Sequence, residues 1–334
     1  MQSKLRIAIG LGLAATVGLA TVVALAVEPI DDLSGDALTP PAASIKIAPP
    51  TDFPDIPLAS SADISAGPVA ANPKNGSRFA AAFATSEGCY VRSTADGGKT
   101  WVARTRLPMP ANTQNCGNPT LTWAPDGSQL YAAYSYFNTY SNGDPKDSGV
   151  VVSVSKNQGI TWSSPVNVMR FTATDRQYLE HAVRVRLATP IRETDAQWVY
   201  LVMEAYITSS DGSGIFFSRS NNRGQTWSGR TVLGGAGMGG GDYLPAIAGG
   251  KGGEVLVTTS RGINFTGETS IQGRRSGNYG VSFGRYFTVA NTQVFNFDTT
   301  AIFGVGGVAH VVFANNTGVH YVFSLKAPYT TWSA

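Results

Sequence analysis

The residue types that most often carry chemistry are few and scattered in this chain. The 334 residues include three histidines, at positions 181, 310 and 320, and their spacing forms no metal-ligand cluster. Glu180 and His181 are adjacent, but no nucleophile motif accompanies them, so the sequence gives no support for a Ser-His-Asp mechanism. The glycine-rich stretch 234–241 lacks the Lys-Ser/Thr ending of a phosphate-binding loop. We therefore expect neither a metal nor a cofactor.

Carboxylate chemistry stays open, because acidic residues are present but no pair is recognisable. A glycosidase requires two carboxyl groups separated by about 5 to 10 Å. Asp126 lies in a turn-like context, and the other acidic residues are mostly isolated in the sequence. The sequence alone therefore brings no two carboxylates together.

The two cysteines, Cys89 and Cys116, are the only thiols in the chain. Neither has the neighbours of a zinc site, and an N-terminal export signal, described below, points to an oxidising compartment. We expect a disulfide between them, with two buried free thiols as the alternative.

An eight-residue pattern, Ser/Thr-x-Asp/Asn-x-Gly-x-Thr-Trp, occurs three times with start-to-start spacings of 61 and 65 residues. Each copy follows a β-rich run, and such repetition indicates a repeat architecture. Asp or Asn can hydrogen-bond to the backbone nearby, and Gly accepts a positive φ, so each copy is expected to close a hairpin. The pattern residues are Thr94, Asp96, Gly98, Thr100 and Trp101; Ser155, Asn157, Gly159, Thr161 and Trp162; and Ser220, Asn222, Gly224, Thr226 and Trp227.

These three copies resemble the Asp-box, or BNR, repeat of sialidase-like β-propellers. The resemblance implies an all-β chain, with a propeller of five to six blades built on Asp-box hairpins. Five blade-like units are countable, but no fourth copy is recognisable between residues 274 and 287, and only Thr331-Trp332 remains of a fifth. The resemblance also implies that the boxes lie on the outer rim and are structural. Closure of the ring needs a strand from residues 44–71, where Ser44–Ile47 is the most strand-like piece.

A sialidase of this family uses three arginines, a tyrosine activated by a glutamate, and an aspartate. The family's early Arg-Ile-Pro signature is absent, because the approach to the first unit reads Ser77-Arg78-Phe79. The resemblance places blade-opening loops at the central channel. On that basis, if the protein is an enzyme, the nearest candidates for its catalytic residues are Asp175, Arg176, Glu204, Arg261 and Tyr279.

Two segments precede the predicted propeller domain, which covers residues 64–334. Residues 1–26 carry Lys4 and Arg6, then a run of twenty apolar or small residues, which is typical of a signal peptide but also long enough for an uncleaved membrane anchor. Residues 27–63 contain seven prolines, seven acidic residues and one lysine, and read as an extended arm or linker. We expect an apolar N-terminal helix, a Pro-rich arm and an exported domain on the periplasmic or extracellular side, tethered to the membrane through residues 1–26 if these are not cleaved.

Charge and aromatic patterns favour an interaction surface. Residues 64–334 carry 22 basic and 15 acidic side chains, a net charge of +7, without the dense basic tract of a nucleic-acid module. Arginine and aromatic residues are common at interfaces, although a solvated blade face or core packing explains them equally well. The interaction candidates are Arg170, Arg176, Arg184, Arg186, Arg192, Tyr136, Phe137 and Tyr140.

Two functions follow from these patterns. The first is a non-catalytic exported propeller that acts as an interaction or scaffolding subunit of a membrane-associated complex. Its protein partners would contact the N-terminal segment, the arm and a propeller face. The second is a secreted sialidase-like glycoside hydrolase with a diverged active site, for which the partner is an acidic glycan.

Overall fold

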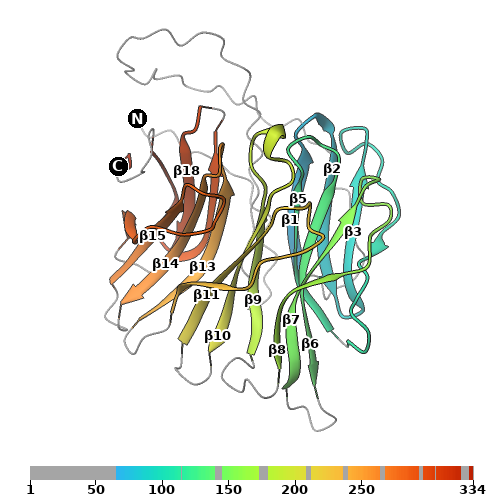
Figure 1. Ribbon diagram of the computed structural model, residues 1–334, viewed down its shortest axis with the longest axis horizontal. Helices are drawn as coiled ribbons and strands as arrows, with labels where there is room; N and C mark the ends of the chain where they lie inside the picture. The colour runs from blue at the N-terminus through green and yellow to red at the C-terminus, as the bar shows by residue number, and fades with distance from the viewer. Residues whose placement is uncertain are drawn as a thin grey trace.

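The computed structural model describes residues 65–113, 115–139, 145–172, 180–207, 212–235, 240–263, 268–292, 296–304, 306–324 and 331–333. Within them, five antiparallel sheets form the blades of a β-propeller (Figure 1). The expected N-terminal helix and Pro-rich arm lie outside the described residues. No helix in the described part of the chain is long and apolar enough to span a membrane.

The strands follow one another from the centre of each blade outward. Blade one comprises β1 (Ser65–Asn72), β2 (Asn75–Thr85), β3 (Gly88–Thr94) and β4 (Thr105–Arg106). Blade two comprises β5 (Asn115–Trp123), β6 (Leu130–Thr139), β7 (Pro145–Ser155) and β8 (Val166–Thr172). Blade three comprises β9 (Glu180–Ala188), β10 (Val199–Ile207), β11 (Gly212–Ser220) and β12 (Thr231–Gly234), with a short 3-10 helix at Glu193–Asp195. Blade four comprises β13 (Gly240–Gly249), β14 (Val255–Ile263), β15 (Glu268–Ser276) and β16 (Phe287–Asn291), and blade five β17 (Asn296–Phe303), β18 (Ala309–Asn315) and β19 (Gly318–Ser324).

Strand β1 corrects one expectation about closure of the ring. Residues 65–71 belong to the span that was expected to complete the last blade, yet they form the innermost strand of blade one and pair with β2. The segment reads Ser-Ala-Gly-Pro-Val-Ala-Ala-Asn and has only one β-branched residue, so composition did not mark it as a strand. Its proline is accommodated by a register shift between Ala66 and Val69, which suits an innermost edge strand.

Apolar side chains between successive blades form the core. One cluster joins blades one and two, the next joins blades two and three, and two more continue the series to blade five. Because a strand presents alternate side chains to its two faces, a blade packed on both sides must be apolar on both. The central part of β10, from Val199 to Ala205, is buried at every position, as this arrangement requires.

The eight-residue turns close the hairpins between the third and fourth strands. In the third copy, the Ser220 hydroxyl accepts from the Gly224 amide at 2.9 Å, and Asn222 Oδ1 accepts from the Thr226 amide at 2.9 Å. Gly224 has φ of +81°, in the left-handed region that favours glycine. Both bonds span four residues. Trp227 is half-buried and packs against the core of blades two and three.

A fourth copy of this turn is present where the sequence showed none. Ser276 accepts from the Gly280 amide at 2.9 Å, and Asn278 Oδ1 accepts from the Ser282 amide at 3.0 Å, which reproduces the bonds of the other turns. Serine replaces the pattern's threonine, and Phe283 replaces its tryptophan. The Ser282 hydroxyl accepts from the Asn278 side-chain amide, as the threonine hydroxyls of the second and third turns accept from their asparagines. The Phe283 ring packs against the core, but it lacks the indole N–H that Trp227 donates to the Gly224 carbonyl.

The aspartate of the first turn makes that hairpin sensitive to acid. The pKa of Asp96 is lowered from its ordinary 3.8 to about 2, because the Thr100 hydroxyl, the Thr100 amide and the Thr94 hydroxyl donate to its carboxylate. Since the folded pKa is depressed, this stabilisation is complete above about pH 4 and is lost as the pH falls towards 2. Unfolding measured from pH 4 to pH 2 should depend less on pH in Asp96→Asn, which copies the other turns. An unchanged pH dependence would contradict this role for Asp96.

Candidate functional site

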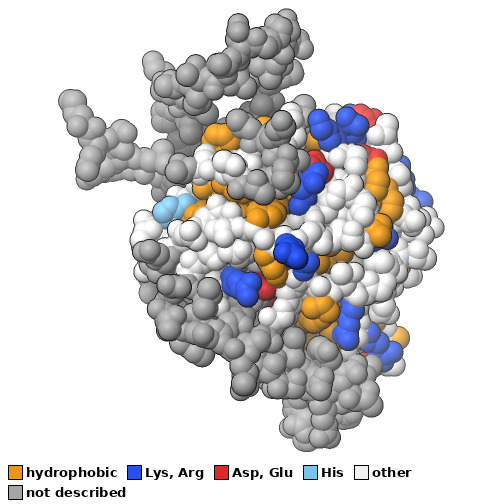
Figure 2. Space-filling model, turned by 60° about the vertical axis from the view of Figure 1, so that its left-hand side comes forward, with side chains coloured by type: hydrophobic (Ala, Val, Ile, Leu, Met, Phe, Trp, Pro, Cys, Tyr) orange, Lys and Arg blue, Asp and Glu red, His pale blue; other side chains and the backbone are white. Residues whose placement is uncertain are grey.

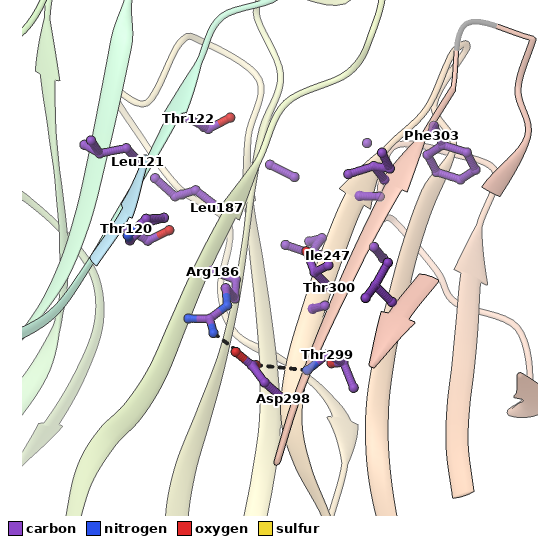
Figure 3. A pocket seen from close by; sticks show the side chains of 18 of the residues that line it. Thr120, Leu121, Thr122, Arg186, Leu187, Ile247, Asp298, Thr299, Thr300 and Phe303 are labelled. Atoms are coloured by element: carbon purple, nitrogen blue, oxygen red, sulfur yellow. Dashed lines mark hydrogen bonds and ion pairs between the residues drawn. The ribbon is translucent and has the colours of Figure 1, made fainter. Parts of the chain in front are cut away.

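The innermost strands of all five blades enclose a central cavity of about 450 Å³. Strand β5 contributes Thr120 and Thr122, β9 contributes Arg186, and β17 contributes Asp298 and neighbouring threonines. Figure 3 shows these polar side chains together with aliphatic ones from β9 and β13. A concave site with a few converging polar groups among apolar ones is the usual form of a small-ligand site.

Two arginines and two carboxylates form the charged centre of this region. The Arg186 guanidinium donates from Nη2 to Asp298 Oδ1 at 3.4 Å (Figure 3), and Arg184 Nη1 lies 3.7 Å from the same oxygen. Arg184 Nε lies 4.0 Å from Glu204 Oε2. Arg184, Arg186 and Asp298 remain partly exposed, whereas the Glu204 side chain is only 7% exposed. Arg186 and Asp298 line the cavity, so a ligand there can reach them, whereas Arg184 and Glu204 lie outside the lining and support Asp298 and each other.

The backbone of Leu244 in β13 connects blade four to residues of blades three and five beside this charged centre. Its amide donates to Glu204 Oε2 at 2.9 Å, and its carbonyl accepts from the Thr299 hydroxyl at 2.7 Å. Leu244 has φ of +55° and lies in a β-bulge beside Pro245, where ladder pairing with β14 is interrupted. Glu204 of blade three and Thr299 of blade five thus satisfy the backbone groups of blade four that the bulge leaves without ladder partners.

A second polar group lies between blades three and four, away from the cavity lining. The Tyr286 hydroxyl lies 2.8 Å from Asp242 Oδ2 and 2.6 Å from the Leu233 carbonyl. Arg261 and Arg274 both lie over the Tyr286 ring, at 5.4 and 5.0 Å from its centroid. Burial raises the pKa of Asp242, and burial together with Asp242 raises the pKa of Tyr286.

The enzyme candidates from the sequence fall in three different places. Glu204 lies behind the cavity, as described above, and Arg261 stacks on Tyr286. Tyr279 is not at the channel: it occupies the fourth position of the blade-four turn, with φ of +59°. Its ring stacks on Trp198 at 4.5 Å, and its hydroxyl donates to Asp195 at 3.2 Å, so it fastens blade four to blade three. Asp175 and Arg176 lie outside the described residues.

The interaction candidates do not form one surface. Arg186 lines the central cavity, and Arg184 pairs with Asp298 and Glu204. Arg170 instead pairs with Asp147 on the outer part of blade two, and Arg192 lies exposed before the 3-10 helix. Tyr136 is buried, which corrects the expectation that it is presented outward. Phe137 is half-buried, and Arg176 and Tyr140 lie outside the described residues.

The remaining predicted features have clear positions. Cys89 of β3 and Cys116 of β5 are joined by a disulfide that links blades one and two. Among the described residues, no group of three or more His, Cys, Asp or Glu side chains is placed to hold a metal. Sequence reasoning missed Asp298 as a site residue, although its place at the opening of the fifth unit was a usable signal.

The fold and the cavity define a β-propeller with a charged central site. No family model matches the sequence, and no curated protein matches it. A protein of unknown function from Dyadobacter fermentans aligns with a TM-score of 0.58 and 13% identity, over 82% of this chain and 83% of that chain. An α-L-arabinofuranosidase from Fusarium graminearum aligns with a TM-score of 0.56 and 13% identity, over 81% and 79%. An α-L-arabinanase from Penicillium chrysogenum aligns with a TM-score of 0.51 and 14% identity, over 76% of both chains. At these identities the likeness establishes the fold, and the Asp-box resemblance rests on the turns.

Proposed function

We propose that this protein is an exported propeller that recognises a saccharide in its central cavity. The observation that carries the proposal is the ion pair of Arg186 from blade three and Asp298 from blade five, which lies in a cavity also lined by threonine side chains. Guanidinium groups donate two parallel hydrogen bonds and carboxylates accept two, so together they match the paired hydroxyls and carboxylates of a sugar. Two of the structurally similar proteins are named as enzymes of arabinose-containing saccharides, which supports a saccharide ligand.

We favour recognition over hydrolysis because the carboxylates of Asp298 and Glu204 already accept hydrogen bonds from neighbouring strands. Asp298 Oδ1 accepts from Arg186 and from the Thr299 amide, and Glu204 Oε2 accepts from the Leu244 amide. A glycosidase needs one carboxyl group available to donate a proton and a second to act as base or nucleophile. One oxygen of each carboxylate, Asp298 Oδ1 and Glu204 Oε2, is therefore engaged in contacts between blades, and the remaining oxygen of Asp298 is the one that we assign to a sugar hydroxyl.

The glycoside hydrolase is the second candidate, and the group around Tyr286 is the observation that favours it. Tyr286, Asp242, Arg261 and Arg274 combine a tyrosine, a carboxylate and two arginines, which are residue types that the sialidase resemblance implies. However, Arg274 Nη1 donates to the Leu233 carbonyl at 2.6 Å, so one of the two arginines is bound to backbone. The raised pKa of Tyr286 also disfavours the tyrosinate that a nucleophile requires.

The proposal predicts that Arg186→Ala weakens saccharide binding by about 10- to 100-fold, since a charge-assisted hydrogen bond to a ligand is lost. Calorimetric titration of the full chain with arabinobiose and with a uronic acid disaccharide measures this. We expect the acidic disaccharide to bind more tightly, because a guanidinium group faces the ligand.

Arg170→Ala is the matched control, because this arginine is exposed and pairs with Asp147 outside the cavity. Equal affinity in the wild type and in Arg186→Ala would contradict the proposed site. Release of free sugar by the wild-type protein would favour the hydrolase instead.

The role as an interaction subunit at a membrane stays a prediction from the leader, the arm and the charge pattern. Localisation on the exported face is likewise part of the proposal.

A further inference from the structure

Blade five differs from the other blades in having one sheet face open. On β18 the buried residues Ala309, Val311 and Phe313 pack towards blade four, and they alternate with half-buried residues on the opposite face. The second strands of blades two, three and four are instead buried on both faces along their central parts. The open face of blade five points away from blade four, towards the place where a ring would meet blade one.

Large apolar side chains stand on this open face. Val319 is 62% exposed, Tyr321 53% and Ile302 51%, although all three belong to paired strands. Tyr321 also hydrogen-bonds to His310 Nδ1 at 2.7 Å, and Figure 2 shows hydrophobic surface beside histidine. A contiguous apolar surface of this kind on a soluble domain usually marks a contact site.

The central cavity reaches this face and continues to blade one. Its lining includes Val312 and Val319 from blade five together with Pro68 and Val69 from β1. Val69 is 41% exposed. Among the described strands, none pairs with β19 on its outer side, where the other blades have their fourth strand. Residues 331–333 contact the C-terminal end of β19 on that side, where the Ser333 amide donates to the Phe323 carbonyl at 2.9 Å. The described blades therefore leave an apolar gap between blade five and blade one.

We propose that residues 44–64 of this chain cover the open face of blade five and close this gap. The chain enters β1 at Ser65, directly beside the gap, so the preceding residues start at the right place. Twenty-one extended residues reach about 70 Å, which is more than the length of a blade strand of nine residues, about 30 Å.

The composition of this segment fits an apolar face. Ile45 and Ile47 flank Lys46, so in an extended chain both isoleucines lie on one side and the lysine on the other. The segment carries further apolar side chains that a solvated linker does not need, and the acidic arm complements the net positive propeller domain. The apolar residues of the segment are Ile45, Ile47, Phe53, Ile56, Leu58 and Ile64.

The test is trypsin cleavage after Lys46, the only basic residue of the arm, measured on the full chain by mass spectrometry. We expect cleavage at least tenfold slower than in a free peptide of residues 40–52. Val319→Asp should accelerate cleavage about tenfold, since a charge replaces an apolar contact. Val281→Asp is the control, because this valine is 60% exposed in the blade-four turn. Thermal unfolding of both variants checks that the blades remain folded.

Three outcomes would overturn the proposal. If trypsin cleaves after Lys46 as fast in the native protein as in the peptide, the segment does not cover the face. A dimer that Val319→Asp dissociates, with Lys46 cleavage unchanged, would assign the face to a second copy of the chain. Equal acceleration by Val319→Asp and Val281→Asp would remove the link to blade five.

Discussion

Removal of the bridge between Cys89 and Cys116 is expected to lower the free energy of unfolding by about 3.5 kcal/mol. The bond closes a loop with a sequence separation of 27 residues, and the loop entropy restored to the unfolded chain gives this magnitude. The bridge also holds β3 of blade one against β5 of blade two, where Cys89 is fully buried. The double variant Cys89→Ala/Cys116→Ala, unfolded in urea, measures the loss.

Reductant serves as the internal control for this prediction. Adding it should destabilise the wild type and leave the double variant unchanged, because the variant has no thiol. Alkylation of two free thiols in the native protein, or a double variant as stable as the wild type, would contradict the prediction.

Glu204→Ala should lower the free energy of unfolding by about 3 kcal/mol, although Glu204 lies behind the cavity rather than in it. The change removes the acceptor of the Leu244 amide and the carboxylate that faces Arg184. Leu244 is only 4% exposed, so water does not readily replace the lost acceptor. A buried amide without an acceptor loses its hydration and gains nothing in return. The measurement is urea unfolding of the full chain.

Glu204→Gln separates the two contributions. Glutamine keeps an oxygen that can accept from the Leu244 amide but carries no charge for Arg184. We expect it to recover more than half of the stability lost in the alanine variant. Ordinary surface substitutions change the free energy of unfolding by about 0.5 kcal/mol or less. A Glu204→Ala protein within that range of the wild type would show that the hydrogen bond from the Leu244 amide to Glu204 contributes little.

The propeller fold was predictable because its turns depend on local chemistry. The three sequence copies correctly located hairpins between third and fourth strands, since the bonds of Ser220 and Asn222 lie within one short segment. The fourth turn was missed because Ser282 and Phe283 replace the pattern's threonine and tryptophan, although Ser282 keeps the hydrogen bond to the asparagine and Phe283 keeps the packing. Strand β1 was missed because alanine, glycine and proline carry no strand signal, and its position depends on packing against β2 and β5.

The candidate site was far less predictable, because its residues are brought together by the ring. Arg186 and Asp298 lie 112 positions apart, and no local pattern connects them. Glu204 was selected as a possible channel residue, yet its described role is to hold a backbone amide. Tyr279 was selected because blade-opening loops were expected at the channel, but it lies in an unrecognised turn and its hydroxyl donates to Asp195.

The central claim is that a saccharide binds in the central cavity, where Arg186 and Asp298 form its charged lining. Its most direct test is a crystal structure of the full chain with the tightest-binding disaccharide of the titration. The account predicts a sugar within hydrogen-bonding distance of the Arg186 guanidinium, in the cavity enclosed by β5, β9 and β17. A sugar bound only beside Tyr286 and Asp242, or only on the outer turns with the cavity empty, would contradict it.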